Sequence, residues 1–345
     1  MRRSRKPIVI ASRRSRLAKV QAQRVGEALG RIHPNLNIEY RWIDSEGDAI
    51  TTPLADHGGK GLFTGAIEQA LLDGRADVAV HSMKDLPAVD TPGLTIAAVP
   101  RRADARDCLI SASGALSIGA LPQGATVGTS SPRRAAQVRR LRPDLRVEPI
   151  RGNVETRLSK VLDAAGNPDF DATLLAVAGL KRLGFKEHAN AIIEFEQVLP
   201  AACQGALAVQ CRADDSVTIT RTLPLNDATS ATSAHTERQV VAALGVDCHA
   251  PLAVYVEPVE PEQRGKRKPV GPDYRLRVRV LSQDGRACIE IDEQAPMKEL
   301  RRLVKRVVKE LRAQHALEVM RRPMAPTIPA PQVRIGAQGS TAATR

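Results

Sequence analysis

A short apolar segment that runs into polar and ionisable side chains is the part of this sequence best suited to chemistry. Residues 78–87 read Val-Ala-Val-His-Ser-Met-Lys-Asp-Leu-Pro. Ligands of open α/β sheets usually bind beyond the carboxyl ends of the strands, so we expect Ser82, Lys84 and Asp85 to face a ligand site. Pro87 keeps them out of a long helix, because the residue before a proline is disfavoured in the α region.

Arginines recur where predicted strands pass into predicted helices. A helix N-terminus attracts anions, and a guanidinium binds a carboxylate or phosphate through two parallel hydrogen bonds. Thr129, Ser130 and Gly152 add hydroxyls and close backbone approach at the same places. Any one of these basic residues could be an ordinary solvated charge, but their recurrence favours an anion site. The junction residues are Arg13, Arg14, Arg133, Arg134, Arg151, Arg157, Lys181 and Arg182.

The glycine-rich segment Gly-Gly-Lys-Gly-Leu-Phe at 58–63 does not have the spacing of a nucleotide-binding loop. It lacks the Walker spacing, and Thr64 stands where the dinucleotide pattern requires a third glycine. A mobile loop over a cleft is the better interpretation.

Composition narrows the class of partner. The net charge of +13 suits a nucleic acid, an anionic membrane or a small polyanion, but only 2% of the residues are aromatic, which disfavours stacking on nucleic-acid bases. No apolar run is long enough for a signal peptide or a membrane span. We therefore expect a cytoplasmic protein that binds a small molecule and neither nucleic acid nor membrane.

The five cysteines show neither a CxxC pair nor the spacing of metal ligands. The sequence accordingly predicts no disulfide framework and no metal site. An odd number of cysteines leaves room for one thiol with a special role.

Strand-like and helix-like segments alternate through the first 220 residues or so, which is the signature of an α/β fold. Because most predicted strands are followed by a helix, we expect parallel sheets. The predicted strands cover 8–11, 38–43, 77–80, 94–99, 126–128, 146–150, 172–177 and 203–212, and the helices cover 17–29, 64–72, 132–141 and 154–164.

After about residue 222 the order changes to a smaller α+β pattern. A helix at 230–244 precedes three strands, and apolar residues of a last helix recur at helical spacing from Leu300 to Leu311. The strand 203–212 is expected to return to the first unit, so that two crossings form a hinge. The predicted domains are 1–105 plus 203–222, 106–202 and 223–322, with a disordered tail at 323–345.

Seven segments of the chain occur in the order typical of porphobilinogen deaminases, also called hydroxymethylbilane synthases, and the sequence resembles that family from about residue 8 to residue 315. The segments are Ala-Ser-Arg-Arg-Ser at 11–15, Gly-Gly-Lys-Gly-Leu-Phe at 58–63, Val-His-Ser-Met-Lys-Asp at 80–85, Gly-Thr-Ser-Ser-Pro-Arg-Arg at 128–134, Arg-Gly-Asn-Val-Glu-Thr-Arg at 151–157, Ala-Val-Ala-Gly-Leu-Lys-Arg-Leu at 176–183 and Gln-Gly at 204–205.

The resemblance implies two α/β domains of the periplasmic-binding-protein type joined by hinge strands, and a small C-terminal α+β domain with a three-stranded sheet. The third domain of the family holds a cysteine in thioether linkage to a dipyrromethane cofactor. Cys248 matches that cysteine by its place between a helix and a strand, although Val246 and Asp247 stand where the family usually has glycines. A monomer is also implied.

The activity that the resemblance implies belongs to tetrapyrrole biosynthesis. Enzymes of this family join four porphobilinogen molecules head to tail on the dipyrromethane primer, release ammonia at each step, and then hydrolyse off hydroxymethylbilane. Asp85 matches the catalytic aspartate. A carboxylate there can stabilise the positive charge left on porphobilinogen when ammonia departs, and it can also help move protons.

The other roles are likewise carried over from the family. The cofactor-binding positions are Ser82, Lys84, Asp85, Thr129, Ser130, Arg133, Arg134 and Gly152, with Cys248 as the covalent attachment. The substrate-binding positions are Arg13, Ser15, Arg151, Arg157, Arg182 and Gln204.

Two other interpretations remain open from the sequence. A non-catalytic binding module of the same two-lobed type would bind a small anion reversibly, although neither a signal peptide nor a preceding helix-turn-helix is recognisable. A pseudoenzyme of the family is the other, because the residues before Cys248 are altered.

Overall fold

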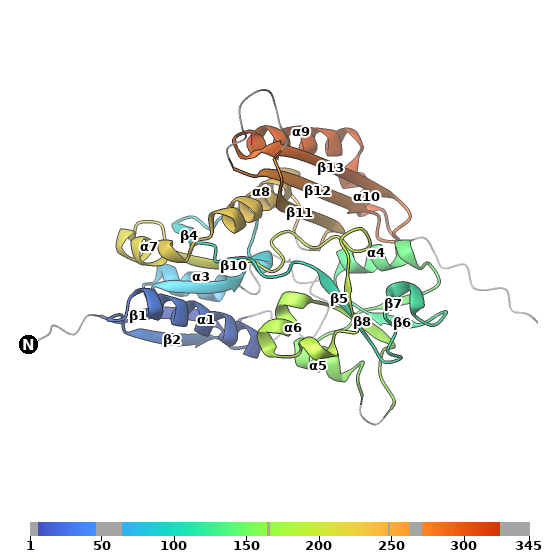
Figure 1. The fold of residues 1–345 in the computed structure, drawn as a ribbon, viewed down its shortest axis with the longest axis horizontal. Helices are drawn as coiled ribbons and strands as arrows, with labels where there is room; N and C mark the ends of the chain where they lie inside the picture. Colours follow the sequence, from blue (N-terminus) through green and yellow to red (C-terminus); the bar gives the residue numbers. More distant parts are fainter. Residues whose placement is uncertain (1–5, 46–63, 164–165, 248, 262–270, 325–345) are drawn as a thin grey trace, which may run out of the picture.

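The computed structural model describes residues 6–45, 64–163, 166–247, 249–261 and 271–324, and the strands in these ranges form three sheets (Figure 1). The first sheet has the order β2-β1-β3-β10-β4. Its strands are β1 (Ile8–Arg13), β2 (Ile38–Ile43), β3 (Val78–Ser82), β4 (Leu94–Ala98) and β10 (Leu207–Arg212). Its helices are α1 (Arg16–Ile32), α3 (Gly65–Leu72) and α7 (Ser216–Thr222).

The second sheet has the order β7-β6-β8-β5-β9. Its strands are β5 (Asp107–Ser111), β6 (Thr126–Gly128), β7 (Arg146–Glu148), β8 (Ala172–Ala176) and β9 (Ala191–Ile193), and its helices are α4 (Pro132–Leu141), α5 (Val154–Ser159) and α6 (Val177–Leu183). Both sheets have an apolar cluster on each face. Consecutive residues of β1, Ile10 and Ala11, pack into different clusters, because successive side chains of a strand point to opposite faces of the sheet.

The two sheets share one topology. In each sheet the second strand in the order, β1 or β6, is parallel to both of its neighbours. The fourth strand, β10 or β5, is antiparallel to both of its neighbours. Strand β1 thus corresponds to β6, and β3 corresponds to β8. The prediction of parallel sheets is confirmed for β1 with β2 and β3 and for β6 with β7 and β8, but it is wrong for β5 and β10, which are antiparallel because each follows a segment that crosses between the sheets. Two parallel neighbouring strands need a crossover connection, usually a helix, that returns the chain to the edge where the first strand began. The segments before β5 and β10, which the structure describes in full, contain no such helix.

The third sheet is antiparallel and has the order β11-β12-β13. It comprises β11 (Leu252–Val259), β12 (Asp273–Leu281) and β13 (Cys288–Pro296), which lie with α8 (Ala228–Leu244), α9 (Leu300–Ala313) and α10 (Ala316–Arg321) above the other two sheets in Figure 1. The apolar stripe predicted for the last long helix is confirmed, since its six residues are all buried in this core: Leu300, Leu303, Val304, Val307, Val308 and Leu311. The predicted α/β class with a small α+β unit is therefore confirmed.

Two chain segments, 99–106 and 194–206, cross between the first and second sheets. They lie against each other, because Arg102 Nε donates to the carbonyl of Gln204 at 2.8 Å and Ala103 N donates to the carbonyl of Gly205 at 3.3 Å. The predicted strand at 203–212 begins only at Leu207. The reason is a turn in which Gly205 has φ +88°, and a Cβ on Gly205 would stand 2.5 Å from the carbonyl oxygen of Ala103.

One buried carboxylate joins these crossings to the third sheet. Glu237 on α8 pairs with Arg102 at 2.6 Å and also accepts hydrogen bonds from the backbone N–H groups of Cys203 at 2.5 Å and Val256 at 2.8 Å. Glu237 is fully buried, so each of these contacts replaces hydration that the carboxylate has lost.

The boundaries of the predicted domains stay a prediction.

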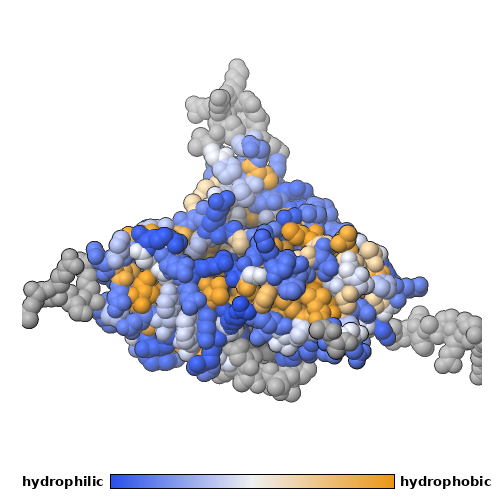
Figure 2. Space-filling model, turned by 60° about the horizontal axis from the view of Figure 1, so that its bottom comes forward, coloured by the Kyte–Doolittle hydropathy of each residue, from blue (hydrophilic) through white to orange (hydrophobic). Residues whose placement is uncertain are grey.

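No helix in the described ranges is both long and apolar enough to cross a membrane. Figure 2 shows a face with hydrophilic side chains across much of its centre and hydrophobic patches on either side. The 58–63 segment and Cys248, for which the sequence made predictions, lie outside the described residues, as does nearly all of the tail predicted at 323–345.

Candidate active site

The carboxyl ends of corresponding strands carry the residues that the sequence singled out. In the first sheet, β1 ends at Arg13, and β3 ends at Ser82, directly before the short 3-10 helix η2 (Met83–Asp85). In the second sheet, the segment 129–131 follows β6 and leads into α4, and α6 follows β8. The open α/β arrangement accordingly places the polar residues of both units at strand ends, where ligands of such folds bind.

Asp85 opens into a pocket of the first unit. Its backbone ends η2, because Leu86 is extended before Pro87. Its side chain is exposed, and it lines the pocket together with residues from β1, α1 and β3. The pocket residues are Ser12, Arg13, Ser15, Leu17, Ala18, Gln21, Thr64, Val80, His81, Ser82 and Asp85. The structure therefore brings the predicted catalytic carboxylate together with the predicted ligand residues Arg13, Ser15 and Ser82.

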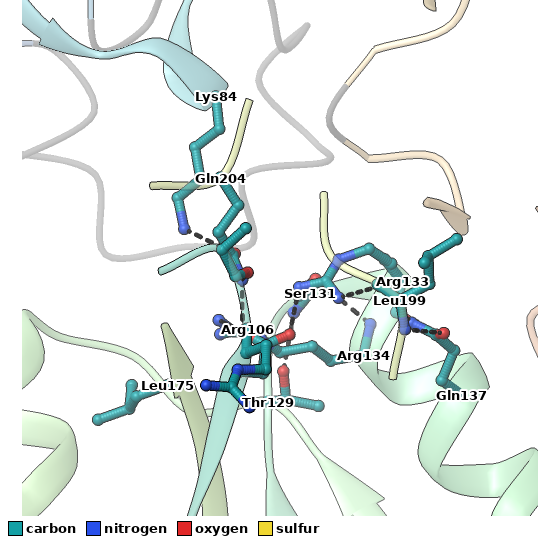
Figure 3. Close-up of polar contacts among 12 residues, drawn as sticks. Lys84, Arg106, Thr129, Ser131, Arg133, Arg134, Gln137, Leu175, Leu199 and Gln204 are labelled. Atoms are coloured by element: carbon teal, nitrogen blue, oxygen red, sulfur yellow. Dashed lines mark hydrogen bonds and ion pairs between the residues drawn. The ribbon is translucent and has the colours of Figure 1, made fainter. Parts of the chain in front are cut away.

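A chain of hydrogen bonds leads from the residue beside Asp85 to the second unit (Figure 3). Lys84 Nζ donates to Gln204 Oε1 at 3.3 Å. Gln204 Nε2 in turn donates to Asp107 Oδ1 at 2.9 Å and to the carbonyl of Ala105 at 2.7 Å. Gln204 is fully buried, so the ends of β3 and β5 are connected through an amide that has no access to water.

Asp107 pairs with two arginines inside the protein. It lies 2.8 Å from Arg133 and 2.6 Å from Arg134, and all three side chains are buried. Burial would raise the pKa of Asp107, but the two guanidinium groups outweigh it and hold that pKa well below its usual value. The predicted cofactor-binding arginines thus have a protein carboxylate as partner, while the Nε atom of each has no partner among the described residues.

The start of α4 places these arginines by its capping. Ser131 is the N-cap, and its hydroxyl accepts from the backbone N–H of Arg134 at 3.4 Å. Thr129 Oγ1 accepts from the N–H of Ser131 at 3.2 Å, and Ser130 Oγ donates to the carbonyl of Ile150 at 2.7 Å. Ser130 is exposed and Thr129 is buried, so of these two predicted residues only Ser130 is open to a ligand on the surface.

Further cations crowd the second unit. Burial, followed by the charges of Arg134 and Arg151, lowers the pKa of Arg157 to about 10. Its Nε donates to the carbonyl of Gly152 at 2.9 Å. Gly152 has φ +109°, and a Cβ there would meet the side chain of Thr156 at 2.6 Å, so this turn needs glycine. These residues form a positive cluster that an anionic ligand would stabilise.

Arg182 stands where the two units meet. Its guanidinium donates to the carbonyl of Gly205 at 2.7 Å, and burial, followed by the charge of Arg24, lowers its pKa to about 10. Arg24 lies on α1 and Arg182 on α6, so these helices bring like charges from both units together. Such repulsion is tolerated where an anion compensates it.

Asp107 and Glu237 are two buried charged residues that the sequence interpretation missed. A signal for Asp107 existed, since it is the single charge at the start of the otherwise apolar strand Asp-Cys-Leu-Ile, where a buried ion pair is expected. Glu237 had no comparable signal, because its helix α8 mixes polar and apolar residues on every face. No group of three or more His, Cys, Asp and Glu side chains in the described part of the chain is arranged to hold a metal ion.

Replacing Lys84 by methionine should stabilise the apoprotein below about pH 8. Burial, followed by the charge of Arg134, lowers the pKa of Lys84 from 10.5 to about 8. The folded state therefore disfavours the ammonium, and this penalty is complete below about pH 8 and fades as the pH rises to 10.5. Urea unfolding across this range should show the advantage of Lys84→Met at pH 7 and its loss at high pH.

The exposed lysine Lys181 provides the control, and Lys181→Met should change the free energy of unfolding by less than about 0.5 kcal/mol. A Lys84→Met apoprotein that is less stable than the parent at pH 7 would contradict this interpretation of Lys84. A residue that costs stability when no ligand is bound is typical of a functional site.

Fold and site together define an α/β protein with two sheets of one topology and a third α+β unit, in which cationic side chains gather near the strand ends of the first two sheets. A family model described as "Porphobilinogen deaminase, dipyromethane cofactor binding domain" matches residues 8–220. Over 318 residues the chain is 40% identical to a porphobilinogen deaminase of Legionella pneumophila. The aligned region covers 92% of this chain and 98% of the relative. The chain belongs to the porphobilinogen deaminase family.

Other relatives agree with this assignment. A porphobilinogen deaminase of Sorangium cellulosum is 48% identical over 251 residues, which are 72% of this chain and 81% of the relative. One of Roseiflexus is 41% identical over 302 residues, covering 82% of this chain and 98% of the relative. Members of the family are transferases of tetrapyrrole biosynthesis with a dipyrromethane cofactor. The predicted family, enzyme class and cofactor are therefore confirmed.

Solved structures with similar folds are more distant. The second substrate-binding domain of a putative amino acid ABC transporter from Streptococcus pneumoniae has a TM-score of 0.41 at 15% identity, covering 69% of this chain and 98% of that domain. A Candida albicans gene product with the generic periplasmic binding protein fold has a TM-score of 0.37 at 11% identity, covering 64% of this chain and 69% of the other.

Proposed function

We propose that Asp85 is the catalytic residue of a porphobilinogen deaminase reaction in this chain, with the surrounding cations binding the carboxylates of substrate and cofactor. The observation that carries the proposal is that Asp85 lines a pocket and directly follows a lysine that is connected to the second unit. Arg13 lines the same pocket, and the neighbouring Lys84 is linked through Gln204 and Asp107 to the arginines of the second unit.

The residues present fit a cofactor that carries several carboxylates. Arg133 and Arg134 are buried and each keeps one unpartnered nitrogen within the described ranges, and the pKa of Lys84 is lowered by burial among positive charges. We assign cofactor binding to Ser82, Lys84, Asp85, Ser130, Arg133, Arg134 and Gly152, and covalent attachment to Cys248. Thr129, which is buried, takes part by holding this turn through the hydrogen bond that it accepts from Ser131. When bound, dipyrromethane supplies the electron-rich pyrrole carbon to which porphobilinogen is joined.

The substrate carries an acetate, a propionate and an aminomethyl group. We assign its carboxylates to Arg13, Ser15, Arg151, Arg157 and Arg182, because these residues supply positive charge or a hydroxyl. Gln204, whose side chain is fully buried, takes part in substrate binding through its hydrogen bond to Lys84. The departure of ammonia leaves positive charge on the substrate ring, and the carboxylate of Asp85 lowers the energy of that state. Asp85 can also accept and return the proton exchanged in the step.

Three further assignments complete the proposal. We infer a cytoplasmic location, a monomeric state, and domains at 1–105 plus 203–222, 106–202 and 223–322. The domain ranges are based on the sheet order, because β9 belongs to the second sheet and β10, the next strand in the chain, belongs to the first. Gel filtration and limited proteolysis between these ranges test the last two assignments.

Intact mass of the denatured protein tests cofactor and attachment site together. The parent should carry a mass excess equal to two linked pyrrole units, and Cys248→Ser should lack it. Cys288→Ser is the matched control, because Cys288 is a free, partly exposed cysteine with no assigned role, and it should keep the excess mass. Retention of the excess in Cys248→Ser would contradict the attachment. A parent without the excess, even after incubation with porphobilinogen, would favour a pseudoenzyme.

A further inference from the structure

We propose that the hydroxyl of Thr64 donates a hydrogen bond to a carboxylate of the substrate bound in the Asp85 pocket. This inference rests on the proposed function of that pocket and adds a positioning residue to it. Thr64 precedes α3 and lines the pocket together with Asp85, Arg13 and Ser15.

The first support for this role is that the hydroxyl of Thr64 makes no hydrogen bond within the described part of the chain. Thr64 is the N-cap of α3, and its backbone carbonyl accepts from Ile67 N and Glu68 N, but its side chain makes no capping hydrogen bond. Threonine at an N-cap usually uses its side-chain oxygen for this purpose. The hydroxyl is therefore left for another partner.

The second support is burial. The side chain of Thr64 is only 2% exposed, and Oγ1 has no hydrogen-bond partner among the described residues. A buried hydroxyl without a partner costs free energy, and native structures rarely keep one without a reason. Because the residue lines a pocket, a bound ligand is the partner that removes this cost.

The chemistry of the pocket indicates which group of the ligand Thr64 contacts. Ser12 already donates to the carbonyls of Ala18 and Val80, and Ser82 exchanges hydrogen bonds with Gln21. The Thr64 hydroxyl thus adds a donor to a pocket that also contains the Arg13 guanidinium. A cation and a hydroxyl donor together suit a carboxylate, whereas the positively charged aminomethyl group is attracted to the carboxylate of Asp85.

The test is the pair Thr64→Val and Thr64→Ser. Valine keeps the branched shape and removes the donor, so it should raise KM for porphobilinogen about tenfold or more and change kcat little, since a hydrogen bond to a charged group is lost. Serine should restore most of the affinity. Thr222→Val is the matched control in the same unit, because the buried hydroxyl of Thr222 donates to carbonyls of its own helix and should leave KM unchanged.

Two further measurements identify the ligand group and separate this inference from the proposed function. Calorimetric binding of a substrate analogue without the aminomethyl group reports affinity even if no turnover occurs, and Thr64→Val should weaken it similarly. With an analogue in which the contacted carboxylate is replaced by a methyl group, which accepts no hydrogen bond, parent and Thr64→Val should bind alike. Unchanged affinity in a folded Thr64→Val protein, or an equal loss in Thr222→Val, would overturn the role of Thr64. Failure of the parent to consume porphobilinogen would overturn the proposed function instead.

Discussion

Asp85→Asn should lower kcat by about 10² to 10⁴-fold and leave the fold intact, since a positioned carboxylate that moves a proton and stabilises developing charge contributes about that much. Asparagine keeps the size of the side chain and removes its negative charge. Asp85 is exposed and makes no hydrogen bond or ion pair with other described residues that would be lost on substitution. Ammonia release measured under saturating porphobilinogen, together with urea unfolding, checks both halves of the expectation.

Asp73→Asn is the control for this experiment. Asp73 is an exposed carboxylate at the end of α3, where it pairs with Arg75 at 2.9 Å, and it lies outside the pocket lining. Its substitution should leave kcat within about twofold of the parent, because exposed pairs contribute little. A folded Asp85→Asn enzyme that keeps more than a tenth of the parent rate would show that Asp85 is not the catalytic residue.

Asp107→Asn should destabilise the protein by about 3–5 kcal/mol, which is the usual effect of removing one partner of a buried ion pair. The substitution leaves the guanidinium groups of Arg133 and Arg134 buried without a counterion. Urea unfolding at pH 7 measures the loss. Substrate affinity should also fall, since Asp107 holds the side chain of Gln204 and thereby Lys84.

The pH dependence of this effect follows from the lowered pKa of Asp107. The parent should hold its advantage above the unfolded-state pKa, about 3.9, and lose it as the pH falls through the lower folded-state value. Asp144→Asn serves as the comparison, because Asp144 forms a partly exposed pair with Arg142, and it should cost less than about 1 kcal/mol. Equal losses in the two variants would contradict the importance of burial.

Elements with strong local signals could be predicted closely from the sequence. The strand at 38–43 and the helix at 132–141 have the predicted ends, because the first alternates in burial and the second begins with a serine cap followed by proline. The helix predicted from 230 begins instead at Ala228, since Asp227 rather than a later residue provides the cap. Local chemistry fixes such elements to within a residue or two.

The contacts that build the site could not be predicted in the same way. Asp107 meets Gln204, which is 97 positions away in the chain, and nothing near either residue indicates the other. The antiparallel direction of β5 and β10 also depends on how the chain crosses between the units, which no local pattern records. The resemblance to a family named candidate residues, and only the tertiary structure shows which of them lie in one pocket.

The position of Glu237 has a consequence for how the chain can be divided. The family model ends at residue 220, so a truncated protein made to those limits would lack Glu237. Arg102 and the N–H of Cys203, both within the retained part, would then lose the carboxylate that they share. The portion that the family model covers therefore depends on α8 for a buried counterion, and we expect excision or domain exchange that leaves α8 behind to cost stability.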